Sequence, residues 1–164
     1  MRQLLRELDA GSGQACAALE QWLLAHPALR TIAVYSPLPG EVDLSAAIHR
    51  RPELRWAYPK VCGQELTFHA MENPATGFVP GAFYILEPAD GSPEVAVGQI
   101  DAFICPGLAF DARGGRLGRG RGFYDRMLAK ARPDALKIGI CFEVQMVPDT
   151  FAEPHDVHMD AVIF

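Results

Sequence analysis

A segment rich in glycine and arginine, residues 114–126, carries the clearest chemical signal in the chain. It reads GGRLGRGRGFYDR, so glycines and arginines alternate through most of it and Asp125 stands near its end. Glycine lets backbone N–H groups converge on an anion because no Cβ stands in the way. Arginine adds charged, forked donors that match phosphate oxygens. The segment therefore predicts a phosphate-binding loop, as in an ATP site, with Asp125 as an oxygen ligand for Mg²⁺.

The charge of this segment supports the same interpretation. Residues 113–126 contain five arginines and one aspartate, whereas the whole chain has a net charge of -5. Clustered like charges repel one another unless an anion lies between them. A solvated surface loop is the alternative. The apolar run at residues 99–105, which reads as a buried strand, leads directly into the segment and favours the phosphate site.

Two widespread phosphate motifs are absent from the segment. The P-loop motif G-x-x-x-x-G-K-[ST] requires a Lys-Ser/Thr pair after its last glycine, and the segment has none. The dinucleotide-binding motif G-x-G-x-x-G requires a different spacing from that of Gly118, Gly120 and Gly122, which stand at alternate positions. Arg-Gly runs also occur in RNA-binding segments. This run is short, unrepeated and flanked by apolar residues in an acidic chain, so no nucleic-acid partner is expected.

Two further candidates follow apolar runs that read as strands. Glu41 comes after the run at 31–35 and its Pro/Gly loop, and Lys60 comes after the run at 54–58. In a parallel sheet such positions face the same crevice as the glycine loop. Each side chain has a simple alternative as a solvated surface charge.

Charged residues near the two ends of the chain are also candidates. Asp156 is a second possible Mg²⁺ ligand, since this ion takes one or two carboxylates together with phosphate oxygens. Arg2 and Arg6 lie one helical turn apart and can clasp an anion together, or form an ordinary solvated face. No Ser-His-Asp or Cys-His arrangement stands out, so transfer of a phosphoryl group to a bound acceptor is favoured over covalent catalysis.

Alternating strands and helices must position these residues. Apolar periodicity predicts helices at 2–8, 14–25, 44–50 and 123–131, and strands at 31–35, 54–58, 66–69, 100–105, 137–142 and 160–164. The helix at 14–25 should bury Ala18, Trp22 and Ala25, and the Gly/Pro-rich residues 72–93 should form extended chain and turns. This order predicts an α/β, three-layer Rossmann-like fold with a mostly parallel central sheet flanked by helices.

Length and composition limit the remaining possibilities. The 164 residues, 49% hydrophobic and 21% charged, suit a single globular domain spanning residues 1–164. The chain shows neither a signal peptide nor a membrane span, and its four scattered cysteines suggest no zinc site or disulfide framework. We expect a cytoplasmic monomer.

The sequence resembles a known family. PGLAFD at 106–111 and RLGRGRGFYDR at 116–126 are similar to the signature of the 5-formyltetrahydrofolate cyclo-ligase family, and shorter stretches resemble its other motifs in the same order: 2–6, 35–43, 58–60, 85–88 and 155–160. The likeness spans nearly the whole chain. The chain departs from the family pattern in three ways. Arg2 stands where Lys is usual, Phe123 replaces the first Tyr of Tyr-Tyr-Asp, and the region between Arg6 and Thr31 is shorter than usual.

The resemblance implies an activity and a set of site residues. The activity is ATP- and Mg²⁺-dependent conversion of 5-formyltetrahydrofolate to 5,10-methenyltetrahydrofolate, with phosphorylation of the formyl oxygen and release of ADP and phosphate. It implies catalytic roles for Arg119, Arg121 and Asp125, and Mg²⁺ ligation by Asp125 and Asp156. The implied ATP-binding residues are Arg2, Arg6, Arg116, Leu117, Gly118, Arg119, Gly120, Arg121, Gly122, Phe123 and Tyr124. The implied folate-binding residues are Ser36, Glu41, Phe83 and Tyr124.

The departures at Arg2 and Phe123 leave an alternative open. A divergent paralogue would keep the fold and the nucleotide site but act on another acceptor, or lack activity. Magnesium-dependent ATP hydrolysis that requires 5-formyltetrahydrofolate would separate the two.

Overall fold

Seven strands form the central sheet of the computed structural model, which describes residues 12–71 and 77–164. Their order across the sheet is β11-β10-β7-β1-β2-β3-β6, and the five strands from β11 to β2 are parallel. β3 and β6 continue the sheet in antiparallel fashion. The bounds are β1 (Thr31–Ala33), β2 (Arg55–Cys62), β3 (Glu65–Ala70), β6 (Glu94–Val95), β7 (Ala102–Cys105), β10 (Leu136–Ile140) and β11 (Ala161–Ile163).

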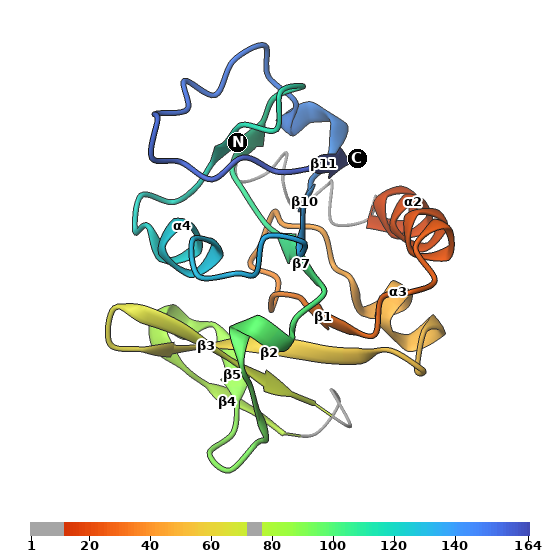
Figure 1. Ribbon diagram of the computed structural model, residues 1–164, viewed down its shortest axis with the longest axis vertical. Coiled ribbons are helices and arrows are strands. Elements are labelled where there is room, and N and C mark those ends of the chain that lie inside the picture. Colours follow the sequence, from red (N-terminus) through yellow and green to blue (C-terminus); the bar gives the residue numbers. More distant parts are fainter. Residues whose placement is uncertain (1–11, 72–76) are drawn as a thin grey trace.

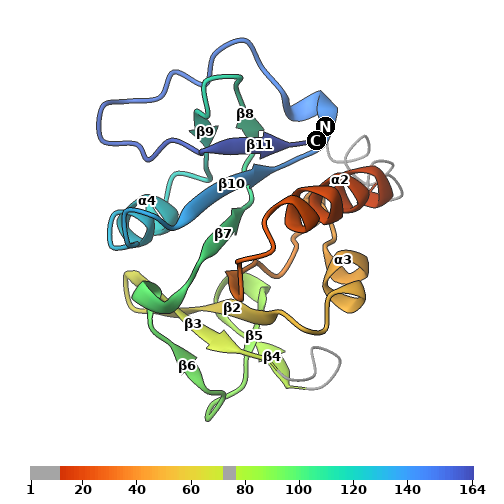
Figure 2. The same cartoon turned by 45° about the vertical axis from the view of Figure 1, so that its right-hand side comes forward.

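Helices cover both faces of this sheet. α2 (Ser12–Ala25) and α3 (Ser45–Arg50) lie on one side, and α4 (Phe123–Leu128) lies on the other (Figures 1 and 2). Two buried apolar clusters follow from this arrangement, one beneath α2 and α3 and one beneath α4. The central strands are therefore buried on both faces, and every residue of β1 and β7 is buried. The predicted three-layer α/β fold is confirmed.

The buried face of α2 differs from the predicted one. Cys16, Leu19 and Leu23 are buried, whereas Ala25 is exposed and Ala18 and Trp22 are only partly buried. The two leucines bury more apolar area than the alanines, so they set the orientation of the helix.

β2 extends further than the sequence suggests, because Pro59 does not end it. β1 pairs with β2 only as far as Ala57, so that side of β2 is an edge beyond this point. A proline at an edge removes no ladder hydrogen bond. β2 therefore continues to Cys62 and forms a long hairpin with β3, in which Pro59 lies opposite Phe68.

Short two-stranded ribbons form in segments where the sequence predicted no strands of the central sheet. β4 (Phe78–Pro80) pairs with β5 (Leu86–Pro88) around a short 3₁₀ turn, η2 (Ala82–Tyr84), within the stretch predicted as extended chain and turns. Single 3₁₀ turns also precede β7 (η3, Val97–Gln99) and follow β10 (η4, Glu143–Gln145). β8 (Ala109–Phe110), just before the predicted phosphate loop, pairs with β9 (Arg116–Leu117) inside that loop.

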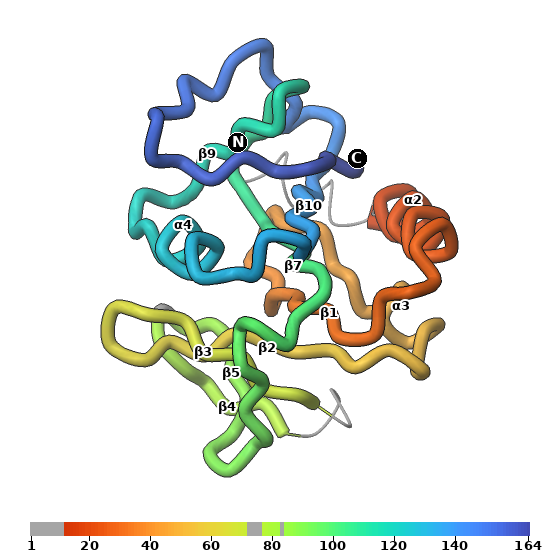
Figure 3. Tube along the Cα trace, viewed as in Figure 1, coloured from red at the N-terminus to blue at the C-terminus, as the bar shows by residue number. Residues whose placement is uncertain are grey.

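The segment between β10 and β11 lies beside the β8–β9 ribbon (Figure 3). The Val147 N–H donates to the Phe110 carbonyl at 2.8 Å, and the Met159 N–H donates to the Gly114 carbonyl at 2.8 Å. The C-terminal part of the chain therefore supports the loop. In the part of the chain that the structure describes, no helix has both the length and the apolar character that a membrane span requires.

Candidate functional site

A cavity of about 820 Å³ opens at the carboxyl edge of the parallel strands. From β1 the chain continues through α3 to β2 on one side, whereas from β7 it continues through α4 to β10 on the opposite side. The strand order therefore reverses between the parallel neighbours β1 and β7. Crevices at such switch points are the usual ligand sites of open α/β sheets. The volume suits a small-molecule substrate or cofactor.

Most of the predicted site residues line this one cavity. They are Ser36 and Glu41 after β1, residues 116–125 after β7, and Asp156. The β2–β3 hairpin adds Pro59, Val61 and Leu66 to the lining. Arg2 and Arg6 lie outside the described residues, as does the side chain of Phe83. Lys60 instead pairs with Asp90, at 2.5 Å between Nζ and Oδ1.

An ion pair joins the glycine loop to the loop after β1. Arg119 donates from Nη2 at 3.0 Å and from Nε at 3.3 Å to Oε1 of Glu41. The other oxygen of Glu41 accepts the Leu38 N–H at 2.9 Å. Glu41 is buried, whereas 48% of the Arg119 side chain is exposed. The Arg119 side chain therefore pairs with Glu41 while about half of it stays exposed at the cavity.

A second ion pair fixes Asp125 within the loop. Nη2 of Arg116 lies 3.2 Å from both carboxylate oxygens of Asp125, and the guanidinium also packs 5.2 Å from the ring centre of Tyr124. Only 5% of the Arg116 side chain is exposed, against 28% of Asp125. Arg116 is therefore an internal support for Asp125, and the carboxylate keeps access to the cavity.

Two polar atoms in the site have no hydrogen-bond partner among the described residues. They are Oγ of Ser36 and Nε of Arg116, and both residues line the cavity. Buried polar atoms are rarely left unpaired in folded proteins. A polar ligand in the cavity would supply a partner for Ser36.

Two tyrosines, Tyr35 and Tyr124, line the cavity, and burial raises the pKa of both. Tyr35 donates its hydroxyl to the Val42 carbonyl at 2.8 Å, which connects the end of β1 to the segment after Glu41. Burial raises the pKa of Tyr35 and of Tyr124 well above the usual value for tyrosine. Neither hydroxyl ionises in the physiological range, so both residues present neutral aromatic rings to the cavity.

Asp111 anchors the glycine loop, a role that the sequence analysis did not identify. One of its oxygens accepts the N–H groups of Arg113 and Gly115, and the other accepts the N–H and hydroxyl of Thr150, all within 3.0 Å. The Thr150 hydroxyl and these backbone donors hold the pKa of Asp111 well below its usual range. Thr150 lies 39 residues away in sequence, so only the fold brings the pair together.

Glu87 is a further carboxylate of the cavity that the sequence left without a role. It is buried in the middle of β5, the second strand of its hairpin, and its Oε1 accepts the Val61 N–H at 3.2 Å. Its carboxylate fills the space beside Gly81, where an added Cβ would overlap it. Glu87 therefore connects the β4–β5 hairpin to the β2–β3 hairpin.

Two carboxylates are available for a metal ion. Asp125 and Asp156 both line the cavity; Asp156 also accepts the Glu153 N–H at 2.7 Å. Across residues 12–71 and 77–164, no three His, Cys, Asp or Glu side chains gather as a metal cage. Two carboxylates beside an arginine loop fit Mg²⁺, which is commonly bound by one or two carboxylates plus substrate phosphates.

Comparison with known sequences gives consistent matches over most of the chain. The sequence profile of the 5-formyltetrahydrofolate cyclo-ligase family matches residues 17–164. A 5-formyltetrahydrofolate cyclo-ligase of Mycoplasma pneumoniae is 32% identical over 149 residues, which cover 88% of this chain and 79% of that protein. Its counterpart from Mycolicibacterium smegmatis is 31% identical, over 82% of this chain and 73% of that protein.

Solved structures agree with this result. The 5,10-methenyltetrahydrofolate synthetase of Aquifex aeolicus superimposes with a TM-score of 0.79 at 27% identity, covering 99% of this chain and 88% of its own. The 5,10-methenyltetrahydrofolate synthetase of Mycoplasma pneumoniae superimposes with a TM-score of 0.74 at 26% identity, covering 99% and 97%.

Proposed function

Since this chain belongs to the 5-formyltetrahydrofolate cyclo-ligase family, we propose that it uses ATP and Mg²⁺ to convert 5-formyltetrahydrofolate into 5,10-methenyltetrahydrofolate, releasing ADP and phosphate. One observation carries the proposal beyond family membership. The arginine loop and the Glu41 loop line the same cavity, so a phosphate donor and a folate would meet there.

The chemistry explains why two substrates must share one cavity. The formyl oxygen is a poor leaving group until it is phosphorylated. It attacks the γ-phosphorus of ATP, and ADP leaves. The neighbouring amine nitrogen of the folate then attacks the formyl carbon, its proton is lost, and the C–O bond breaks to release phosphate. Both steps gain most from holding the reactants close and aligned.

The arginine loop supplies the phosphate side of this scheme. We assign the catalytic contacts to Arg119 and Arg121, whose charges would stabilise the phosphoryl group during transfer. The backbone of residues 117–124 would surround the nucleotide phosphates. Arg116 contributes by fixing Asp125, because its own side chain is almost fully buried.

The loop after β1 supplies the folate side. We assign Glu41 to the N–H donors of the pterin ring, since a buried carboxylate is a strong acceptor for such groups. Ser36 would use its unpaired hydroxyl, and Tyr124 would lie along the flat ring system. Phe83 completes the proposed set from the family resemblance alone.

Asp125 and Asp156 would hold Mg²⁺ beside the nucleotide phosphates. When bound, the ion neutralises charge on the phosphate oxygens. The residues of the chain keep the carboxylates in place: Arg116 holds Asp125, and the Glu153 N–H holds Asp156.

An isotope experiment tests the proposed route. 5-Formyltetrahydrofolate labelled with ¹⁸O in the formyl group is incubated with the protein, unlabelled ATP and Mg²⁺, and the released phosphate is analysed by mass spectrometry. The proposal predicts one labelled oxygen in each phosphate formed. Unlabelled phosphate, with the methenyl product present, would mean that the formyl oxygen is not phosphorylated.

A further inference from the structure

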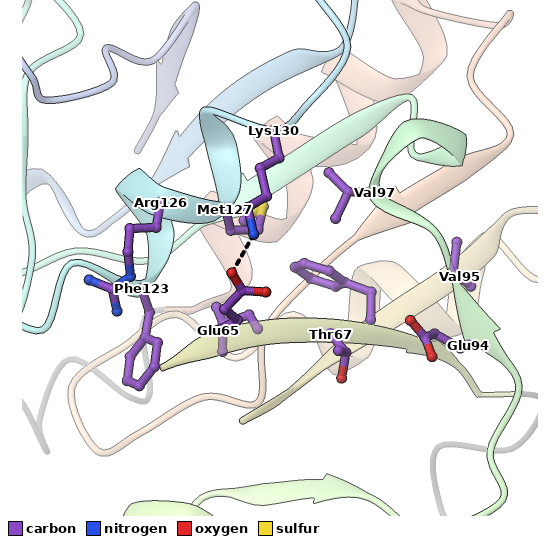
Figure 4. A pocket seen from close by; sticks show the side chains of 11 residues that line it. Glu65, Thr67, Glu94, Val95, Val97, Phe123, Arg126, Met127 and Lys130 are labelled. Atoms are coloured by element: carbon purple, nitrogen blue, oxygen red, sulfur yellow. Dashed lines mark hydrogen bonds and ion pairs between the residues drawn. The ribbon is translucent and has the colours of Figure 1, made fainter. Parts of the chain in front are cut away.

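Arg126 joins two walls of the large cavity through main-chain carbonyls. From α4, its Nη1 donates to the carbonyl of Arg121 at 3.0 Å, while Nη2 and Nε donate to the carbonyl of Gln64 at 2.8 and 3.2 Å. Its guanidinium lies 5.3 Å from the ring centre of Phe123. Figure 4 shows Arg126 and Phe123 near one end of a smaller cavity of about 160 Å³ between α4 and β3.

The contact with Arg121 fixes the orientation of a peptide group in the glycine loop. A trans peptide is planar, so its carbonyl and the following N–H point in opposite directions. Because the Arg121 carbonyl faces Arg126, the N–H of Gly122 points away from Arg126. Gly122 itself lines the large cavity, and a Cβ there would lie 2.6 Å from Nη1 of Arg126. The glycine therefore leaves space for the guanidinium that orients it.

The contact with Gln64 fixes the opposite wall. Gln64 lies in the turn between β2 and β3, and the hairpin below it contributes Val61 and Leu66 to the large cavity. One guanidinium thus holds the glycine loop and the hairpin in a defined relation.

A neighbouring ion pair makes a similar connection without touching the glycine loop. Nζ of Lys130, one turn beyond Arg126, lies 2.5 Å from Oε1 of Glu65, beside Gln64 (Figure 4). Lys130 and Arg126 therefore both tie the α4 region to the same hairpin. Of these two side chains, Arg126 is the one that also donates a hydrogen bond to the glycine loop.

We propose that Arg126 is a positioning residue for nucleotide binding. It orients the Arg121–Gly122 peptide and holds the hairpin against the loop, so that the loop is organised before ATP arrives. Its three guanidinium nitrogens face main-chain carbonyls, which separates this role from the phosphate contacts of Arg119 and Arg121. The inference rests on the proposed function, because it takes ATP as the ligand of the loop.

Three variants test the role: Arg126→Met, Arg126→Lys and Lys130→Met. ATP affinity is measured by titration calorimetry in the presence of Mg²⁺, and stability by thermal unfolding. Arg126→Met should raise the Kd for ATP about tenfold, since a loop that must order on binding loses affinity. Arg126→Lys should stay weak, because one ammonium cannot reach both carbonyls in the geometry of the planar fork. Lys130→Met should bind ATP within about twofold of wild type, although it loses a comparable connection to the hairpin.

Other results would overturn the proposal. Wild-type affinity in Arg126→Lys would show that charge alone matters, and equal losses in Arg126→Met and Lys130→Met would show general docking of the helix. Wild-type affinity in Arg126→Met, in a protein whose wild type forms the methenyl product, would refute only the role of Arg126. A wild-type protein without ATP affinity would refute both this role and the proposed function.

Discussion

Replacing Asp111 with asparagine tests how the glycine loop is held. Asp111 is 1% exposed, and its two oxygens accept four hydrogen bonds, from Arg113, Gly115 and Thr150. Asparagine has the same shape but only one acceptor oxygen, so at least one buried backbone N–H faces an amide NH₂ group in either orientation. A buried donor without an acceptor costs about 1–3 kcal/mol, and weaker bonds to the neutral oxygen add to this. We expect a loss of about 3 kcal/mol, which lowers Tm by roughly 9 °C.

Asp149→Asn is the matched control for Asp111→Asn. Asp149 lies in the segment that supports the same loop and pairs with Arg113 at 2.7 Å, but 42% of its side chain is exposed. Its replacement should leave Tm close to that of wild type, since exposed ion pairs contribute little. Thermal and urea unfolding followed by circular dichroism measure both variants. Equal losses in the two, or no loss in Asp111→Asn, would refute the anchoring role.

The pH dependence of stability gives a second readout for Asp111. Its pKa in the folded protein is depressed below the unfolded value of about 3.9. The stabilisation is therefore fully present above about pH 5 and is lost as the pH falls below about 4 toward the folded pKa. The stability difference between wild type and Asp111→Asn should shrink between about pH 6 and pH 3. A constant difference would contradict the assignment.

The remaining predictions concern the metal ligand, the loop and a strained aromatic residue. Asp125→Asn should keep the fold and the contact with Arg116. It should raise the Mg²⁺ concentration needed for half-maximal turnover about tenfold, because the charged ligand is lost. An unchanged half-maximal Mg²⁺ concentration would show that Asp125 is not a metal ligand. Gly120→Ala should weaken ATP binding more than the control Gly91→Ala. Both glycines have positive φ and open space around the added Cβ, but of the two only Gly120 lines the cavity. Equal effects on ATP binding would mean that the phosphates bind elsewhere. Tyr84→Asn should raise Tm by roughly 2–4 °C, since Tyr84 has φ +61° and is 98% exposed, and asparagine tolerates this backbone better; an unchanged or lower Tm would mean that the tyrosine makes compensating contacts.

The sequence predicted the parts of the fold that depend on local pattern. Apolar runs located the central strands, and the glycine–arginine segment marked a loop that does line the main cavity together with Glu41. Both features are encoded in neighbouring residues. The length of β2 was missed because the effect of Pro59 depends on where its partner β1 ends.

The internal contacts of the site were not predictable in the same way. Arg116 and Arg119 look alike in the sequence, yet one is buried against Asp125 and the other is half exposed against Glu41. Glu41 and Arg119 are 78 positions apart, so no local pattern links them. Tertiary packing decides which arginine supports the loop and which can meet a ligand.

The formation of 5,10-methenyltetrahydrofolate, followed by its own absorbance band, tests the central claim most directly. The purified protein is mixed with 5-formyltetrahydrofolate, ATP and Mg²⁺, and each of the three is omitted in turn. The account predicts an increase in absorbance that needs all three components, with one ADP formed for each methenyl product. No increase from folded protein that still binds ATP would contradict the account and point to a different acceptor in the cavity.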